Sequence, residues 1–391
     1  MPSLPAWQPS QGQILLLRCA LAAGPEEALG HWRALHARHS EVLQESAAIR
    51  LFPLVYHHFK DAYPEVPYFE QVKARYQMTW VQNNFLIKEM MPVLAALSED
   101  GIPVMLLKGA ALVQDLYENP GLRPMRDLDA VVPREYAAKA VLKVESLGWR
   151  LDSEMPRERI FRNLHGISFK RGESQLDLHW NVLWCSRAPG ADDDFWKDSR
   201  PLSDPNTSIG VLCPEDQLIH LCAHGARTGR NAYSEAHRAY LQWIPDSVLL
   251  LRRYPSLDWT RLINQSRKRF LRLQVYEVLC FLKDVFGEPV PGAVLAEMGR
   301  KPFSYREKRH YLLTRWSSNP IYFKTVRNFW GRYEADYLQT SPLGYEPSLG
   351  ALDLGFNFPG YLQKIYGADS SRAALARLIK NLFENPRRIL N

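Results

Sequence analysis

Two short segments alternate apolar and polar residues in a way that few folds can accommodate. The first, Leu128–Val132, follows Asp127 and contains Asp129; the second, Gln175–Trp180, contains Asp177. Residues i and i+2 of a β-strand point to the same face, so each segment is predicted to be a strand with one apolar and one acidic face. Both strands are therefore expected in a sheet that is covered by apolar packing on one side and carries carboxylates on the other.

The segments around these strands predict a small mixed α/β unit. An apolar run, Pro103–Leu107, precedes a helical stretch, Ala110–Tyr117, and a further helix is predicted over Glu135–Leu147. A turn that contains glycine joins the strand Ile167–Lys170 to the strand that carries Asp177. This order of strands and helices within one short stretch is typical of an α+β domain with a mixed sheet.

The remainder of the chain is predicted to be mainly helical. Phe69–Leu97 keeps apolar residues at three- and four-residue intervals, which predicts one long helix that Pro92 could kink. Beyond a loop-like stretch, Arg187–Ser208, helical periodicity returns over Pro214–Arg227, Ser234–Arg253, Trp259–Ser266 and Leu271–Phe286. We therefore predict an α+β fold with an N-terminal helical region (1–97), a small mixed-sheet core (98–187) and a mainly helical C-terminal region (188–391).

Composition and charge argue against several classes of protein. None of the five cysteines forms a Cys-x-x-Cys pair, so neither a zinc knuckle nor a disulfide framework is predicted. The amino terminus lacks the pattern of a secretory signal, and no apolar run reaches the roughly 20 residues that cross a bilayer. We therefore expect a cytoplasmic protein without a membrane partner. The formal net charge of +7 favours anionic ligands such as nucleoside triphosphates.

The acidic faces of the two strands indicate a metal site. If the strands are neighbours, the carboxylates of Asp127, Asp129 and Asp177 converge, and burying them without cations would be costly. Arg123 and Arg126 could neutralise them in a purely structural ion-pair network. Alternatively, the three carboxylates could bind one or two divalent ions and leave positions open for substrate phosphates, as a two-metal phosphoryl or nucleotidyl transfer site requires.

A phosphate-binding element is predicted upstream of the first acidic strand. Lys108 and Gly109 follow an apolar strand and open a helix, so backbone N–H groups and the helix dipole face the connecting loop. Glycine permits close approach of a phosphate oxygen to the backbone, and lysine adds a positive charge for a triphosphate. Further candidates for nucleotide binding are Arg123, which could instead tether the loop, Arg126, and His179, which could instead be structural.

These motifs resemble the nucleotidyltransferase superfamily with the DNA polymerase β fold, and most closely its uncharacterised bacterial branch. The resemblance is carried by Leu107-Lys108-Gly109, by Arg123-Pro124-Met125-Arg126-Asp127-Leu128-Asp129 and by Asp177-Leu178-His179-Trp180. It covers residues 100–185, with a weaker similarity over 214–224.

The resemblance implies a polymerase β-like core, Mg²⁺ or Mn²⁺ as cofactor, and an NTP, expected to be ATP, as donor. Asp127 and Asp129 would bind both metal ions, while Asp177 would bind the catalytic ion and assist deprotonation of the acceptor. Lys108 and Gly109 would receive the triphosphate. Better-known members carry Gly-Ser where this chain has Lys108-Gly109, and the next residue here is alanine, which offers no hydroxyl.

The sequence thus predicts an enzyme that moves a nucleoside monophosphate from an NTP to a hydroxyl or phosphate of a small molecule, peptide or protein. Two alternatives stay open: a catalytically silent regulatory protein of toxin–antitoxin type, and an enzyme that adds nucleotides to RNA ends. An aromatic and basic stretch from Trp316 to Tyr333 could stack bases, although a helical packing face explains it better. His220 and His224, four residues apart on a predicted helix, are interpreted as structural or cleft-lining.

Overall fold

A computed structural model describes residues 8–202, 209–228 and 241–316, together with Tyr333, 336–341, Leu343, 358–363 and 368–384. The first part of the helix predicted over Ser234–Arg253, and most of the aromatic stretch before Tyr333, lie outside these described residues.

A mixed sheet lies at the centre of the described structure, with the strand order β3-β4-β5-β2-β1-β7-β6. The strands are β1 Val104–Leu107, β2 Leu128–Val131, β3 Arg150–Leu151, β4 Gly166–Arg171, β5 Ser174–His179, β6 Arg200–Pro201 and β7 Ile209–Val211. β1 pairs antiparallel with β2 and parallel with β7, whereas β2 pairs parallel with β5. The predicted α+β class is confirmed. The sheet also continues past residue 187, because β6, which lies in the stretch expected to be a loop, and β7 extend it beside β1.

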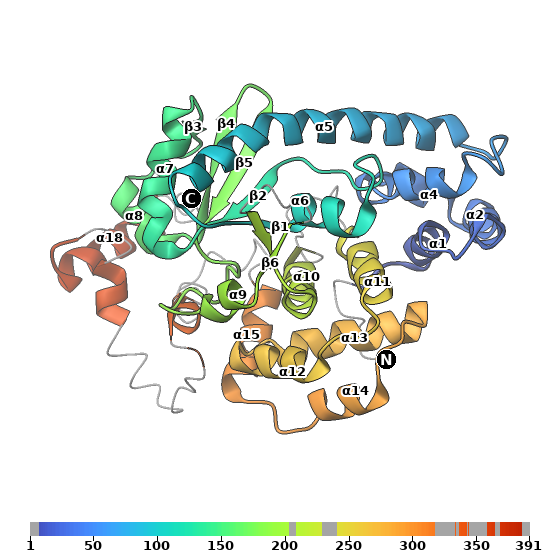
Figure 1. The fold of residues 1–391 in the computed structure, drawn as a ribbon. Coiled ribbons are helices and arrows are strands. Elements are labelled where there is room, and N and C mark those ends of the chain that lie inside the picture. The colour runs from blue at the N-terminus through green and yellow to red at the C-terminus, as the bar shows by residue number, and fades with distance from the viewer. Residues whose placement is uncertain are drawn as a thin grey trace.

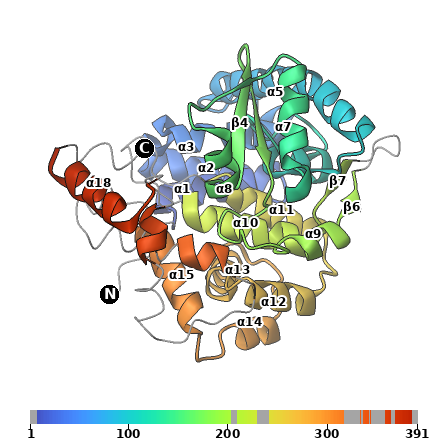
Figure 2. The same cartoon turned by 90° about the vertical axis from the view of Figure 1, so that its left-hand side faces the viewer.

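Helices surround the sheet on both sides, and each view shows α5 and α7 opposite α10, α12 and α14 (Figures 1 and 2). The N-terminal helices are α1 Gln11–Ala20, α2 Pro25–Arg38, η1 Ser40–Gln44, α3 Ser46–Ile49, α4 Phe52–Phe59 and α5 Phe69–Glu99. Those within the sheet region are α6 Lys108–Leu112, the π-helical turn Val113–Tyr117, η3 Arg134–Tyr136, α7 Ala137–Ser146 and α8 Arg157–Asn163. The C-terminal ones are α9 Asp193–Lys197, α10 Pro214–Thr228, α11 Trp243–Arg253, α12 Trp259–Lys268, α13 Arg272–Phe286, α14 Gly292–Met298, α15 Tyr305–Trp316 and α18 Ser371–Glu384.

The two faces of the sheet pack against different sets of helices. Ala130 and Leu178 point toward α5 and α7 and share a core with them. Val131 points to the opposite face and belongs to the core built from the N-terminal and C-terminal helices. Side chains alternate along a strand, so Asp129 and Asp177 lie on the face opposite α5 and α7. The apolar residues between the acids therefore anchor the strands while the acids face away.

The long helix predicted over Phe69–Leu97 is confirmed as α5, which contains Pro92 and runs along one edge of the molecule (Figure 1). It ends at Glu99 with Asp100 as its C-cap, and Gly101 then adopts a φ of +71°, a conformation that glycine reaches without steric cost. Within the part of the chain that the structure describes, no helix has both the length and the apolar character needed to cross a bilayer.

α5 also holds the loop that leads into the acidic strand β2. Asn83, fully buried on α5, donates from Nδ2 to the carbonyl oxygens of Pro120 (2.6 Å) and Arg123 (2.8 Å). Its Oδ1 accepts from the backbone N–H of Met125 at 3.2 Å. One amide side chain therefore satisfies three backbone groups of an irregular segment, and this fixes where β2 begins.

Candidate active site

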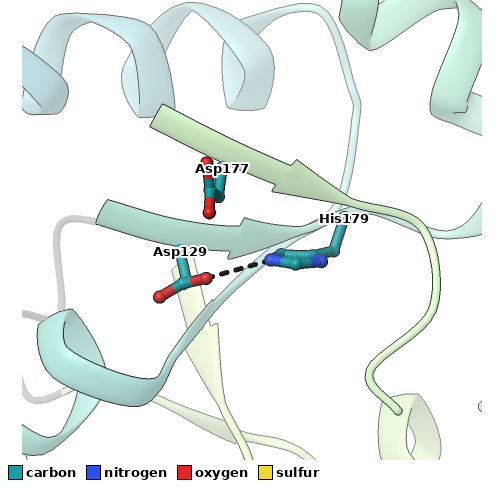
Figure 3. Close-up of side chains that lie close together, drawn as sticks. All are labelled: Asp129, Asp177 and His179. Carbon is teal, nitrogen blue, oxygen red and sulfur yellow. Dashed lines mark hydrogen bonds and ion pairs between the residues drawn. The ribbon is translucent and has the colours of Figure 1, made fainter. Parts of the chain in front are cut away.

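Strands β2 and β5 place two acidic residues side by side. The strands pair in parallel with Asp129 opposite Asp177 and Val131 opposite His179, which confirms the expectation that they are neighbours. Paired residues of adjacent strands point to the same face, and the close-up shows both carboxylates on that face (Figure 3). Residues 48 positions apart (177 − 129) in sequence therefore contribute to one site.

Asp129, Asp177 and His179 form a group that could hold a metal ion. Each offers one donor atom, and the three atoms lie within 4.8 Å of one another (Figure 3). Asp129 and His179 are buried, whereas Asp177 is partly exposed. Two carboxylate oxygens and an imidazole nitrogen are donors that divalent ions accept. The sequence left His179 as either a substrate contact or a structural histidine, and the structure places it directly beside the acids.

Two cationic or polar groups stabilise the ionised form of Asp129. The Nζ of Lys108 forms an ion pair with Oδ1 of Asp129, and Nε2 of His179 lies 3.0 Å from the same oxygen. Burial alone would raise the pKa of Asp129, but Lys108 and His179 outweigh it and hold that pKa well below its usual range. The neutralising charge is thus Lys108, which differs from the arginine network considered as the structural alternative.

Lys108 reaches Asp129 from an unusual backbone conformation. It directly follows β1, opens α6 and adopts a φ of +47°, a region that residues other than glycine rarely occupy. Burial by itself lowers the pKa of Lys108, but the charges of Asp129, Asp127 and Asp177 raise it overall, so the ammonium stays protonated. The charges of three acidic residues therefore act on one lysine, which lies at the C-terminal end of β1.

Asp127 lies one residue before β2 and outside the group of three donor atoms. Its environment is nevertheless set by them. Burial raises its pKa to about 6, and the negative charges of Asp129 and Asp177 contribute to the increase, while Lys108 and Arg50 oppose it. A third negative charge at this place is therefore unfavourable, and an added cation would relieve that repulsion.

One oxygen of Asp177 is held by its neighbours. Its Oδ1 accepts hydrogen bonds from the hydroxyl of Ser168 at 2.6 Å and from Nε2 of Gln175 at 3.0 Å. Ser168 lies opposite Asp177 on β4, so the sheet itself orients the carboxylate. Within the described residues Oδ2 has no hydrogen-bond donor, which leaves it available to a ligand.

Arg123 and Gly109 are locked into the structure around the loop. The Nε and Nη2 of Arg123 donate to the two carboxylate oxygens of buried Asp246 at 2.8 and 2.7 Å, and Tyr117 donates to the same carboxylate at 2.7 Å. Arg123 thus tethers the loop to α11, one of the two roles that the sequence left open. A Cβ on Gly109 would lie 2.7 Å from Nη1 of Arg123 and 2.9 Å from Met125, so packing alone requires glycine there.

Arg126, which the sequence proposed for nucleotide binding, forms a basic cluster near Asp127 with two arginines that the sequence did not indicate, Arg50 and Arg75. Arg126 is exposed, and Arg50 donates from Nη2 to the carbonyl oxygen of Pro124 at 2.7 Å. Burial lowers the pKa of Arg75 on α5, and the charges of Arg50 and Arg126 lower it further, so both charges act on Arg75. These arginines come together only because the N-terminal helices pack onto the loop. No local sequence pattern predicts that packing.

His220 on α10 lies within electrostatic range of Asp129 and Lys108. It is 4% exposed, and burial lowers its pKa to about 3, with the charge of Lys108 adding to the decrease and that of Asp129 opposing it. Its ring stacks on His224 with centroids 6.3 Å apart, and its Nδ1 has no hydrogen-bond partner in the described structure. A neutral histidine that borders the site fits the structural or cleft-lining interpretation.

A mixed sheet with acids opposed on parallel neighbouring strands, preceded by a Lys-Gly turn into a helix, is the arrangement expected of an α+β nucleotidyltransferase core. The chain belongs to the family described as "Uncharacterised nucleotidyltransferase", whose profile matches residues 36–287. The match begins within α2, so most of the N-terminal helical region lies inside the matched stretch.

The solved structures that are similar to the chain include two nucleotidyltransferases. One is the solution structure of the antibiotic-resistance factor ANT(2'')-Ia, with 14% identity over 52% of this chain and 95% of that chain, and a TM-score of 0.31. The other is the crystal structure of a tRNA nucleotidyltransferase with a primer tRNA and an incoming ATP analog, with 16% identity over 76% of this chain and 97% of that chain, and a TM-score of 0.19. No curated protein sequence matches.

Proposed function

We propose that the protein is a divalent-metal-dependent nucleotidyltransferase that uses an NTP, ATP by expectation, and that Asp127, Asp129 and Asp177 form its catalytic acidic group. The observation that supports this most directly is the convergence of donor atoms from Asp129, Asp177 and His179 within 4.8 Å. A family of nucleotidyltransferases supplies the reaction class, and the acidic group supplies a place for the metal.

The residues present fit Mg²⁺ or Mn²⁺. Carboxylate oxygens suit both ions, and the imidazole of His179 suits Mn²⁺ better than Mg²⁺. The raised pKa of Asp127 is a second sign, because a bound cation would remove the repulsion that causes it. When bound, the metal would lower the pKa of the attacking hydroxyl and stabilise charge on the α-phosphate during in-line displacement.

The chain's own residues have separable tasks in this proposal. Asp177, oriented through Oδ1 by Ser168 and Gln175, presents Oδ2 to the acceptor hydroxyl and can receive its proton. Without metal, Lys108 is the counter-ion of Asp129 and stays beside it. A metal ion bound at Asp129 would take over that role, and the ammonium could then turn toward the triphosphate. The carboxylate of Asp129 thus links metal binding to the position of Lys108.

We propose that the triphosphate extends from Gly109 at the start of α6 toward the basic cluster beside Asp127. Arg126 is the exposed member of that cluster and therefore the one best able to reach a phosphate. Arg123 would act here indirectly, since its guanidinium already binds Asp246 and supports the loop. The positive charges of the basic cluster, Arg50, Arg75 and Arg126, would stabilise the negative charge on the β- and γ-phosphates.

The experiment measures pyrophosphate release and nucleotide binding with each NTP in the presence of Mg²⁺ or Mn²⁺. We expect wild-type protein to bind ATP with metal, to release pyrophosphate when an acceptor hydroxyl is supplied, and to prefer Mn²⁺. Asp129→Asn and Asp177→Asn should lose pyrophosphate release by about 100-fold or more, because the metal loses a ligand. Asp100→Asn, a change to a surface acid that pairs with Lys143, should leave release unchanged.

Two results would count against the proposal. Folded wild-type protein that binds no NTP in the presence of either metal would exclude an NTP-using site. Unchanged turnover in Asp129→Asn would show that Asp129 holds no catalytic metal.

A further inference from the structure

The outer face of α5 carries an apolar stripe that the described structure leaves uncovered. Met78, Val81 and Phe85 are 50%, 60% and 54% exposed, and Ala74 on the same face is also exposed. Figure 1 shows α5 along one edge of the molecule with its far side turned away from the sheet. Soluble proteins rarely expose large apolar side chains next to one another, and such a patch is typical of an interaction surface.

The stripe follows the spacing of a coiled-coil seam. Its members recur at intervals of three, four, three, four and three residues, namely Gln71, Ala74, Met78, Val81, Phe85 and Lys88. The inner face of α5 uses a different set of residues, namely Val72, Thr79, Asn83, Leu86 and Met90. The seam is therefore additional to the intramolecular packing of α5 and is free to receive a second helix in a knobs-into-holes arrangement.

The seam is complementary to itself when a second copy runs antiparallel. In the heptad notation of coiled coils, Gln71, Met78 and Phe85 are a positions, and Ala74, Val81 and Lys88 are d positions. In the antiparallel orientation each a position meets a d position, which pairs Met78 with Val81, Ala74 with Phe85 and Gln71 with Lys88. The largest side chain thus meets the smallest, and the lysine at one end meets a neutral glutamine. The flanking positions then pair Gln77 with Asn84 and Arg75 with Gln82, so no like charges oppose each other.

A parallel pair would be far less favourable. It would place Phe85 on Phe85 and Lys88 on Lys88 across the axis, with Ala74 facing Ala74 and leaving a gap. The pattern therefore selects not only a partner helix of the same sequence but also its direction.

We propose that residues 71–88 of α5 form an isologous interface through which two copies of this chain pair antiparallel about a two-fold axis centred between positions 79 and 80. One helix pair buries less surface than the standard interface of about 1,600 Å², so we expect reversible dimerisation in the micromolar range. The inference does not depend on the proposed function, because none of the four apolar residues belongs to the acidic site.

Sedimentation velocity of the full chain tests the interface from about 1 to about 200 μM, the range in which a small interface should populate both states. We expect wild type to shift from monomer to dimer across it. Val81→Glu and Phe85→Glu should weaken association by about 100-fold, because each places charges opposite an apolar partner. Leu142→Glu, a control on α7 where the leucine is 56% exposed, should dimerise like wild type.

Disulfide mapping then tests the register. Ala74→Cys and Phe85→Cys proteins, mixed under mild oxidation, should give a cross-linked heterodimer faster than either variant alone. Peptide mapping should show the 74–85 linkage, which distinguishes it from any bond to Cys213 or Cys280. Wild type that stays monomeric at every concentration would overturn the proposal. So would a dimer that survives Phe85→Glu, or preferential 74–74 cross-linking.

Discussion

Replacing Lys108 by methionine should destabilise the metal-free protein and at the same time tighten its binding of Mn²⁺. Lys108 is the counter-ion of buried Asp129, and methionine keeps the length of the side chain while removing its charge. The strained backbone at residue 108 is the same in both proteins, since neither side chain is glycine. The substitution therefore measures the effect of the positive charge of Lys108 alone.

The magnitude follows from burial. Removing one partner of a fully buried ion pair costs about 3–5 kcal/mol. The side chain of Asp129 is 5% exposed but that of Lys108 is 26% exposed, and His179 remains as a second partner of Asp129. We therefore expect about 2 kcal/mol of lost stability without metal. If Mn²⁺ competes with Lys108 for Asp129, the same free energy reappears as affinity, so Mn²⁺ should bind the variant about 30-fold more tightly.

Urea denaturation with and without Mn²⁺ measures the first quantity, and calorimetric titration of Mn²⁺ measures the second. Lys143→Met is the matched control: its side chain is also 26% exposed, but its partner Asp100 is 34% exposed, so the loss should stay below about 1 kcal/mol. Pyrophosphate release should fall in Lys108→Met despite tighter metal binding. Equal Mn²⁺ affinity in the variant and wild type would refute the idea that lysine and metal share Asp129.

Two further predictions concern stability. Burial raises the pKa of Asp192 to about 7, so the folded protein holds that proton more tightly than the unfolded chain and should lose stability as pH rises from 5 to 8. The free energy of unfolding of Asp192→Asn, measured by denaturation at pH 5 and pH 8, should rise by about 2–3 kcal/mol relative to that of wild type between the two pH values, because asparagine does not titrate. A difference between the two proteins that is the same at both pH values would contradict this. Gly109→Ala should cost about 1–3 kcal/mol because its Cβ meets Arg123 and Met125. Gly30→Ala, which meets nothing within 4 Å in the middle of α2, should be neutral or stabilising, and similar losses at both glycines would show that packing is not the cause.

The parts of the fold that the sequence predicted are those with a local signal. The helix α5 follows from apolar spacing over Phe69–Leu97, and β2 and β5 follow from the alternation around Asp129 and Asp177. Alternation also places both acids on one face, so the parallel pairing of these strands was the only non-local step needed to bring them together. That step was a hypothesis at the level of the sequence, and the register confirms it.

The parts that the sequence did not predict depend on tertiary packing. β6 and β7 are two and three residues long, too short for a periodic signal, and they become strands because β1 has a free edge. Nothing near Arg123 in the sequence indicates that Asp246 will bind it, and nothing near Arg75 places it beside Arg126. Partners of buried charges are chosen by the fold, so composition and spacing give the charge but not its counter-ion.

The site gathers several unfavourable features within a short stretch. Lys108 occupies a conformation that costs of the order of 1 kcal/mol, and Asp127 carries a charge that burial and two neighbouring acids oppose. Such a stretch stays folded only if the surrounding structure fixes it, and two buried features do so: the pairing of Arg123 with Asp246 and the clamp that Asn83 forms on the loop. A metal ion at the acids would relieve the repulsion at Asp127, so its binding energy would add to the stability of the fold, and the clamp would hold Asp129 and Asp177 in place for it.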